Sequence, residues 1–264
     1  MNLGLSRRFG ASVVVLTLLL AGCCYYVFKA ATVRLIAQSD VRVVPFVLQR
    51  EVYYYRDNPG GELRMRETVA RRSDGARVEI SSDPPAVKAL AGRTIKFLDG
   101  SSVDLIDLLK SKTTWPASEA QASVLRARTL NPPRNCVFAG ETLASEGATL
   151  LGQKVAVVKL GPPHGPRITA WRAPNLGCTD LQYRSEDARP DGSYKLVTED
   201  RAVSLRLVEP DPALFDEGRD YAELRPSELG SRVDAWFGVT SVGEDVQKPR
   251  DQADRLYDQS WAGH

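Results

Sequence analysis

Histidine is nearly absent from this 264-residue sequence, and its scarcity removes several classes of catalytic and metal site. Only His164 and the last residue, His264, are present, so one chain cannot assemble a multi-histidine metal centre. His164 lies in a run of glycine and proline at 161–166, where no motif supplies a nucleophile or an orienting partner. No phosphate-loop, hydrolase or dinucleotide motif occurs. We therefore expect no metal, no cofactor and no enzymatic activity.

An excess of charge of one sign is also missing. Lysine and arginine number 35 against 33 aspartate and glutamate, which leaves a formal net charge of +2 at pH 7. Dedicated nucleic-acid-binding proteins depend on clustered cations that contact many phosphates. We therefore expect no nucleic-acid partner. The length and the 43% hydrophobic content are sufficient for one domain with a substantial core.

Cysteine is sparse, with four residues in two groups. Cys23 and Cys24 lie in an apolar segment near the amino terminus, which leaves Cys136 and Cys178 for the folded part. In an exported domain such an isolated pair predicts one disulfide, with two buried free thiols as the alternative. The disulfide would close a loop of about 40 residues and stabilise the fold by roughly 3–4 kcal/mol on the chain-entropy estimate. The chain cannot supply the four ligands of a structural zinc site.

One long apolar run is present. Between Arg8 and Lys29 lie 20 residues without a charge, and two arginines precede them. Twenty helical residues span a bilayer core of about 30 Å, and the preceding cations favour a cytoplasmic amino terminus. Residues 1–29 are therefore predicted to be a membrane anchor or a signal peptide, followed by a juxtamembrane linker at 30–44.

The sequence Leu-Ala-Gly-Cys that ends at Cys23 resembles the lipobox of bacterial lipoproteins. In that alternative the signal peptide is removed and Cys23 becomes the lipidated first residue of the mature chain. A plain cleaved signal peptide is a third alternative. All three place the folded part outside the cytoplasm, on the periplasmic or cell-surface side, and the first two attach it to a membrane.

From about residue 43 the sequence has the pattern of short amphipathic strands separated by turn residues. At 76–80, for example, Ala, Val and Ile alternate with Arg and Glu, a period of two that buries one face of a sheet. Asp-Gly pairs at 74–75, 99–100 and 191–192 are typical of tight turns. These patterns predict strands near 46–56, 62–72, 76–81, 93–98, 102–109, 153–160, 166–172, 180–186, 193–200 and 202–208.

Residues 118–130 carry a helix signal, with Ser118 as the expected N-cap and Asn-Pro-Pro at the end. The predicted fold class is α+β and strand-dominated, with a curved antiparallel sheet (a half-barrel) packed on one or two helices. We assign this β-rich domain to residues 45–230. Residues 231–264 are predicted to be a polar tail with a short amphipathic helix.

Five arginines lie close together in the predicted hairpins: Arg64, Arg66, Arg71, Arg72 and Arg77. Such a basic stripe would suit anionic lipid headgroups. Glu62, Glu67 and Glu79 are interleaved with the arginines. We therefore expect a cross-strand lattice of opposite charges on a solvated face.

Residues 170–178, with the sequence Ala-Trp-Arg-Ala-Pro-Asn-Leu-Gly-Cys, precede a returning strand at 180–184. This unit resembles the lipoprotein-carrier superfamily, which includes LolA-like periplasmic carriers and the sigma-factor regulator RseB. The run 209–215, with Tyr221 after it, is similar to the closing segment of uncharacterised members, so that the resemblance covers residues 45–230. Cys178 stands where those carriers lack a cysteine.

The resemblance implies a half-barrel around an apolar cavity for acyl chains, in a protein that moves, senses or presents lipids or lipoproteins without catalysis. No ligand-binding residue carries over, because that cavity has no fixed motif. We therefore expect a membrane-tethered, extracytoplasmic module that binds an acyl chain or a lipoprotein. The alternative is a structural or interaction subunit of a cell-envelope complex, with an envelope protein as partner. A large apolar pocket favours the first, and a packed core with an exposed apolar patch favours the second.

Overall fold

The computed structural model describes residues 43–55, 58–82, 92–162, 165–237 and 244–262. Residues 43–264 form one compact unit. The predicted membrane segment at 1–29, with Cys23, lies outside the described residues, as does His164. Within the described part, no helix combines the length and the apolar character needed to cross a bilayer.

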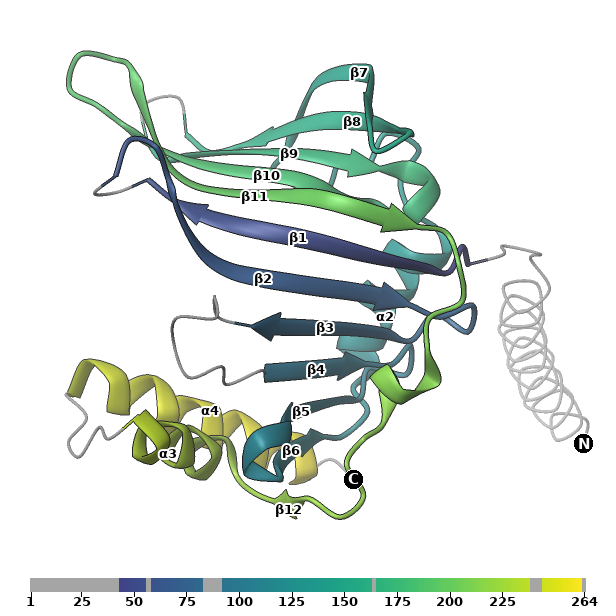
Figure 1. The fold of residues 1–264 in the computed structure, drawn as a ribbon, viewed down its shortest axis with the longest axis vertical. Coiled ribbons are helices and arrows are strands. Elements are labelled where there is room, and N and C mark those ends of the chain that lie inside the picture. Colours follow the sequence, from purple (N-terminus) through teal and green to yellow (C-terminus); the bar gives the residue numbers. More distant parts are fainter. Residues whose placement is uncertain (1–42, 56–57, 83–91, 163–164, 238–243, 263–264) are drawn as a thin grey trace, which may run out of the picture. The chain divides into compact units, whose positions relative to one another are not determined.

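One sheet of 12 strands forms the frame, in the order β12-β6-β5-β4-β3-β2-β1-β11-β10-β9-β8-β7 (Figure 1). All neighbouring strands are antiparallel except β12 and β6, which form a two-residue parallel pair. The strands are β1 (Phe46–Tyr54), β2 (Glu62–Arg71), β3 (Arg77–Ser82), β4 (Gly92–Lys96), β5 (Ser102–Ile106), β6 (Ser111–Trp115), β7 (Thr142–Leu150), β8 (Gln153–Leu160), β9 (Arg167–Ala173), β10 (Thr179–Ala188), β11 (Tyr194–Arg206) and β12 (Ala222–Glu223).

The described helices are α2 (Glu119–Leu130), α3 (Pro226–Phe237) and α4 (Glu244–Ala262). Short 3-10 turns are η1 (Asp107–Leu109), η2 (Pro174–Leu176) and η3 (Pro212–Phe215). The strand-dominated α+β class and the curved sheet predicted from the sequence are thus confirmed. Two predicted strands, 193–200 and 202–208, are one strand, β11. Strands β6, β7 and β12 were not predicted, because their sequences lack a clear alternation of hydrophobic and polar residues.

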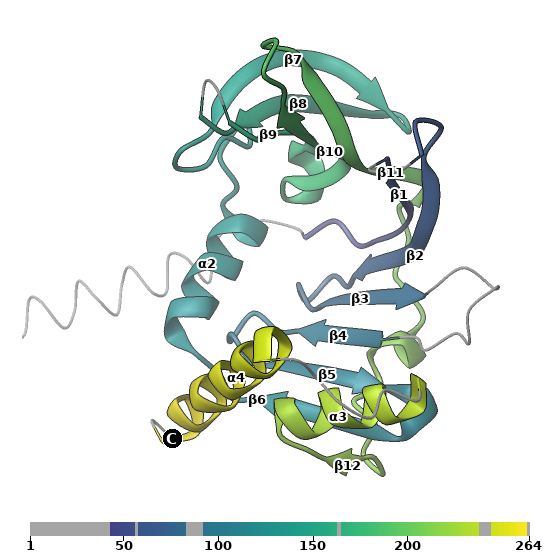
Figure 2. The same ribbon diagram turned by 90° about the vertical axis from the view of Figure 1, so that its left-hand side faces the viewer.

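The apolar side chains form two main clusters on opposite faces of the sheet. Outer-face residues of β3 to β5, such as Val78 and Ile95, pack against Phe215 of η3, which covers them. Inner-face residues near the middle of the sheet, such as Phe46 and Leu48, pack against Leu176 of η2. We call the face on which α2 lies the inner face. Figure 2 shows that the sheet curves toward the side on which α2 lies.

Helix α2 begins as predicted, because the Ser118 side chain accepts a hydrogen bond from the Gln121 amide at 3.5 Å. The helix approaches the β4–β5 turn closely at Gly100, where φ is +87°. A Cβ atom added there would lie 2.2 Å from the Ser118 carbonyl oxygen. Glycine is therefore required at this turn for two reasons, its positive φ and the closeness of the helix.

The carboxyl-terminal residues form two helices, α3 and α4, at the two places where the sequence predicts a helix: after Pro226 and in the predicted polar tail. Helix α3 packs against α4 through the Asp234–Arg250 ion pair at 2.6 Å. The Tyr257 ring of α4 meets the Trp115 ring of β6 edge-on, with 5.4 Å between their centroids. The helical pair is thus attached to the β6 end of the sheet.

Candidate functional site: a charged cavity beneath helix α2

A cavity of about 220 Å³ lies between the inner face of β2 to β4, helix α2 and the turn that leads into β10. We call it the α2 cavity. Its lining contains five basic side chains, which are Arg71, Arg77, Lys96, Arg128 and Arg172. Only two acidic side chains, Glu79 and Asp180, line it. The resemblance implied an apolar cavity, whereas the inner-face positions here carry charge.

The strand register creates a row of cations along the cavity floor. Arg71 of β2 is paired directly with Arg77 of β3, and Arg77 is paired with Lys96 of β4. Side chains at paired positions point to the same face of a sheet, and like charges placed opposite each other are destabilising. The sheet therefore holds three cations side by side. In the lattice of opposite charges expected from the sequence, positive and negative side chains would instead alternate across the strands.

Glu79 compensates two members of this row. Its carboxylate oxygens lie 3.0 Å from Arg77 Nε and 3.2 Å from Lys96 Nζ. Burial raises the pKa of Glu79, but the charges of Arg77 and Lys96 outweigh burial and hold that pKa below its usual value. Glu79 is thus an anion that forms ion pairs with two cations.

Arg71 has no carboxylate partner among the described residues. Its Nε and Nη2 atoms donate to the Val44 carbonyl at 3.2 and 2.9 Å, and Nη1 donates to the Leu176 carbonyl at 3.0 Å. Only 4% of the residue is exposed, and its guanidinium lies over the Phe46 ring. Burial, together with repulsion from Arg77, lowers the pKa of Arg71 to about 10. Arg71 therefore remains a cation at neutral pH, held by backbone carbonyls and the Phe46 ring.

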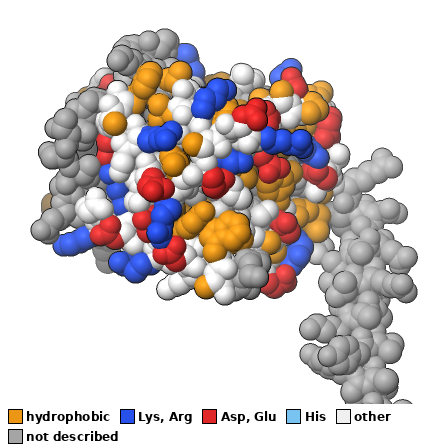
Figure 3. Space-filling view, turned by 90° about the horizontal axis from the view of Figure 1, so that it is seen from below, with side chains coloured by type: hydrophobic (Ala, Val, Ile, Leu, Met, Phe, Trp, Pro, Cys, Tyr) orange, Lys and Arg blue, Asp and Glu red, His pale blue; other side chains and the backbone are white. Residues whose placement is uncertain are grey.

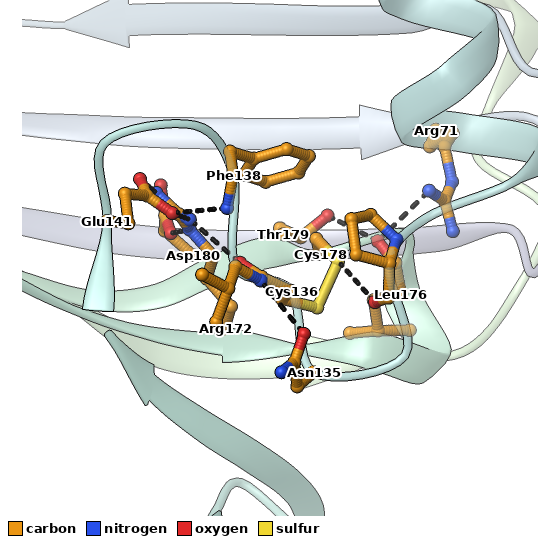
Figure 4. Close-up of a disulfide and its surroundings, with 12 residues drawn as sticks. Arg71, Asn135, Cys136, Phe138, Glu141, Arg172, Leu176, Cys178, Thr179 and Asp180 are labelled. Atoms are coloured by element: carbon orange, nitrogen blue, oxygen red, sulfur yellow. Dashed lines mark hydrogen bonds and ion pairs between the residues drawn. A yellow bond between two sulfur atoms is a disulfide. The ribbon is translucent and has the colours of Figure 1, made fainter. Parts of the chain in front are cut away.

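On the opposite wall of the cavity, Arg172 is paired with two carboxylates (Figure 4). Arg172 donates through Nη1 and Nη2 to both oxygens of Glu141, at 2.5 and 2.8 Å, and through Nε to Asp180 at 2.9 Å. Its Nη1 also donates to the Cys136 carbonyl at 3.0 Å. Glu141 accepts a further hydrogen bond from the Phe138 amide at 2.9 Å. This network fixes the loop after α2 against β9 and β10.

The predicted disulfide lies in the same wall. Cys136 and Cys178 are bonded, and they join the loop after α2 to the turn between β9 and β10. They are 0% and 8% exposed, so the bond is shielded from solvent. Beside them Arg128, in the last turn of α2, lies over the Phe138 ring at 4.7 Å. Arg128 is exposed and has no carboxylate partner in the described part of the chain.

A second charged group lies on the inner face of β2, β1 and β11. Arg50 forms ion pairs with Glu67 and, at 3.0 Å, with Asp200, and their side chains are 11%, 13% and 16% exposed. Burial raises the pKa of Asp200 to about 6 and outweighs the opposing effect of Arg50. The Asp200 Oδ1 atom is buried and has no hydrogen-bond partner among the described residues.

An apolar groove of about 510 Å³ adjoins the α2 cavity. We call it the α2 groove. Helix α2 contributes Ala120, Val124 and Leu125 to it, and the β4–β5 turn contributes small residues. Lys96 and Leu125 line both the groove and the cavity, so the two spaces meet at these side chains. Val124 is 54% exposed.

The sequence identified the disulfide but none of the charged cavity. Arg71 and Arg77 were expected on a solvated face among alternating charges, and that expectation is wrong for Arg71, which is buried. The signal that was missed is the spacing of charged residues at inward-facing positions of apolar strands, such as Arg50 between Leu48 and Val52.

No protein-family model matches this sequence, and no curated protein matches it either. Solved structures do match. The complex of MucA and MucB from Pseudomonas aeruginosa is 14% identical with a TM-score of 0.39, and the match covers 68% of this chain and 58% of that one. PNGF-II is 10% identical with a TM-score of 0.37, over 65% and 30% of the two chains. A LolA superfamily protein from Nitrosomonas europaea is 11% identical with a TM-score of 0.31, over 67% and 92%.

This chain thus spans little more than half of the MucA/MucB chain that it matches. The structures to which this chain is similar include the LolA superfamily, as the resemblance of residues 170–178 predicted.

Proposed function

We propose that this chain is a non-catalytic, extracytoplasmic binding module of the cell envelope, tethered to a membrane through residues 1–29, that binds or senses a lipid or lipoprotein. The observation that carries the proposal is the junction of the charged α2 cavity with the apolar α2 groove at Lys96 and Leu125. A polar space that opens into an apolar one matches an amphipathic ligand, with its head in the cavity and its hydrocarbon in the groove.

The volumes support this division of the ligand. The α2 cavity, at about 220 Å³, is below the range of roughly 300–1,000 Å³ that is typical of ligand pockets. A hydrocarbon chain inside it would strip water from five basic side chains, which is unfavourable without a compensating partner. The groove is larger and carries the apolar side of α2. The hydrocarbon therefore belongs in the groove.

The acidic side chains of the cavity support binding over catalysis. Glu79 contacts two cations, and Asp180 accepts a hydrogen bond from Arg172. A carboxylate whose pKa is held low, as that of Glu79 is, makes a poor general acid or base at neutral pH. Both carboxylates hold the cavity walls in place.

The extracytoplasmic location is supported by the disulfide, because the cytoplasm keeps most thiols reduced. Attachment to the membrane rests on the uncharged run between Arg8 and Lys29, with an uncleaved anchor or a lipidated Cys23 as the two routes.

The second candidate, an interaction subunit of an envelope complex, is favoured by the carboxyl-terminal helices. Leu256 and Trp261 of α4 are 53% and 46% exposed, and Trp236 of α3 is 37% exposed. Seen from below, hydrophobic side chains lie between charged ones of both signs (Figure 3). Exposed tryptophan side chains are typical anchors for a protein partner.

Native mass spectrometry of the full chain, purified from membranes, tests the first candidate against the second. We expect a bound species of several hundred daltons that extracts into organic solvent. Val124→Asp, in the groove, is expected to lose it. Leu256→Asp, an equally exposed helical site on α4, is the matched control and is expected to keep it. A ligand-free wild type that co-purifies with a protein partner, lost only in Leu256→Asp, would favour the interaction subunit.

A further inference from the structure

We propose that the α2 cavity is an oxyanion site, which takes a phosphate or carboxylate group between Arg77, Lys96 and Arg71, with Arg128 at its mouth. The inference rests on the proposed function and names the chemical class of the ligand's head. It is carried by the register of β2, β3 and β4, which places three cations in one row along the lining of the α2 cavity.

Unused hydrogen-bond donors remain on side chains that line the cavity. An arginine has five N–H donors, and Arg71 directs three hydrogen bonds to the carbonyls of Val44 and Leu176. The Arg77 Nη atoms donate to no acceptor among the described residues, and 32% of that side chain is accessible. Lys96 directs one hydrogen bond to Glu79. Guanidinium and ammonium donors that converge in this way suit an oxyanion, which accepts several hydrogen bonds at once.

The charge balance favours an anion. The lining holds five basic and two acidic side chains, and Glu141 behind Arg172 adds one more anion. An excess of two positive charges therefore remains around the cavity. Glu79 and Asp180 are already paired with cations. They therefore repel an anionic ligand less than unpaired carboxylates would.

The size of the cavity agrees with a small head group. At a share of about 30 Å³ for each water molecule in the liquid, a volume of 220 Å³ corresponds to roughly seven waters. That space accepts a phosphate or carboxylate group and part of its hydration, and it excludes a large sugar or a folded peptide. Burial and, to a smaller extent, repulsion from Arg77 lower the pKa of Arg71, and a bound anion would offset both effects on the charged guanidinium.

Titration of the full chain with inorganic phosphate, and separately with acetate, tests the site directly. Calorimetry measures affinity, and thermal unfolding at constant ionic strength measures stabilisation, with chloride as the reference anion. We expect saturable binding and a higher Tm in phosphate, in acetate or in both. The loss of a charge-assisted donor in Arg77→Gln is expected to weaken binding about tenfold or more. Arg126→Gln, on α2 but outside the cavity lining, is the matched control and is expected to change affinity less than about twofold.

Arg128→Gln provides a second variant if Arg77→Gln does not fold, because Arg128 is exposed at the cavity mouth. We expect it to weaken binding by roughly threefold to tenfold. Equal stabilisation by all three anions, or wild-type affinity in folded Arg77→Gln and Arg128→Gln, would overturn the site.

Vesicles distinguish the source of the oxyanion. We expect the full chain to favour phosphatidylcholine vesicles that contain phosphatidic acid over phosphatidylcholine alone, a preference that free phosphate and Arg77→Gln both reduce. Phosphate binding with no vesicle preference would keep the oxyanion site and contradict a lipid head group. A co-purified lipid with no binding of phosphate or acetate would overturn the oxyanion site and leave the proposed function standing.

Discussion

Replacing Asp200 with asparagine removes a buried carboxylate from the inner face of the sheet. Asp200 is 16% exposed and pairs with Arg50, which keeps a second partner in Glu67. Burial raises the pKa of Asp200 from 3.8 to about 6, so the folded protein retains a proton that the unfolded chain releases between these values. We expect Asp200→Asn to stabilise the protein at neutral pH.

The magnitude follows from linkage. Two pKa units at about 1.4 kcal/mol each correspond to roughly 3 kcal/mol. A carboxyl group with a raised pKa lowers stability only where the unfolded chain is ionised. The difference between Asp200→Asn and wild type is therefore near zero below about pH 4, grows as the pH rises to about 6, and is constant above that.

Urea unfolding between pH 4 and pH 8, followed by tryptophan fluorescence, measures this difference. Asp187→Asn, on an exposed position of β10, is the control and is expected to leave the free energy of unfolding within about 0.5 kcal/mol of wild type. If Asp200→Asn were less stable than wild type at pH 8, the ionised Asp200–Arg50 pair would be net stabilising and the reasoning from burial would be refuted.

Three further substitutions test the wall and the cover of the α2 cavity. Cys136→Ser and Cys178→Ser are each expected to lower the free energy of unfolding by roughly 3–4 kcal/mol under oxidising conditions, and the double variant by no more; additive losses would contradict the disulfide. Gly100→Ala is expected to cost well above the roughly 1–2 kcal/mol of a left-handed alanine, because its Cβ would clash with Ser118. Gly147→Ala is its control, with φ at +90° and no atom within 4 Å of the added Cβ. Equal losses of stability at the two glycines would show that α2 does not press on the turn.

Local sequence patterns predicted the parts of the fold that local forces decide. Alternation at 76–80 predicted β3, Asp-Gly pairs predicted the turns, and Ser118 predicted the start of α2. Strand β7 was missed because its residues 142–149 are exposed, so no alternation marks a buried face. Its amino-acid composition gives no other strand signal.

The charged cavity depends on register, which a single sequence does not determine. Arg71, Arg77 and Lys96 form a row only because β2, β3 and β4 pair at these positions, and a shift of one residue would turn one of them to the other face. Arg50 and Asp200 are joined across a long stretch of sequence by the pairing of β1 with β11. The disulfide was predictable because only two cysteines remained to form it.

Photo-crosslinking at Leu125 tests the central claim most directly, because this side chain lines both the cavity and the groove. A photoreactive amino acid is placed at Leu125 or, as a control, at Leu256 of α4, and cells are irradiated before purification. We expect an adduct with a lipid mass at Leu125 and none at Leu256. Adducts only at Leu256, with a protein partner, would contradict a ligand beneath α2.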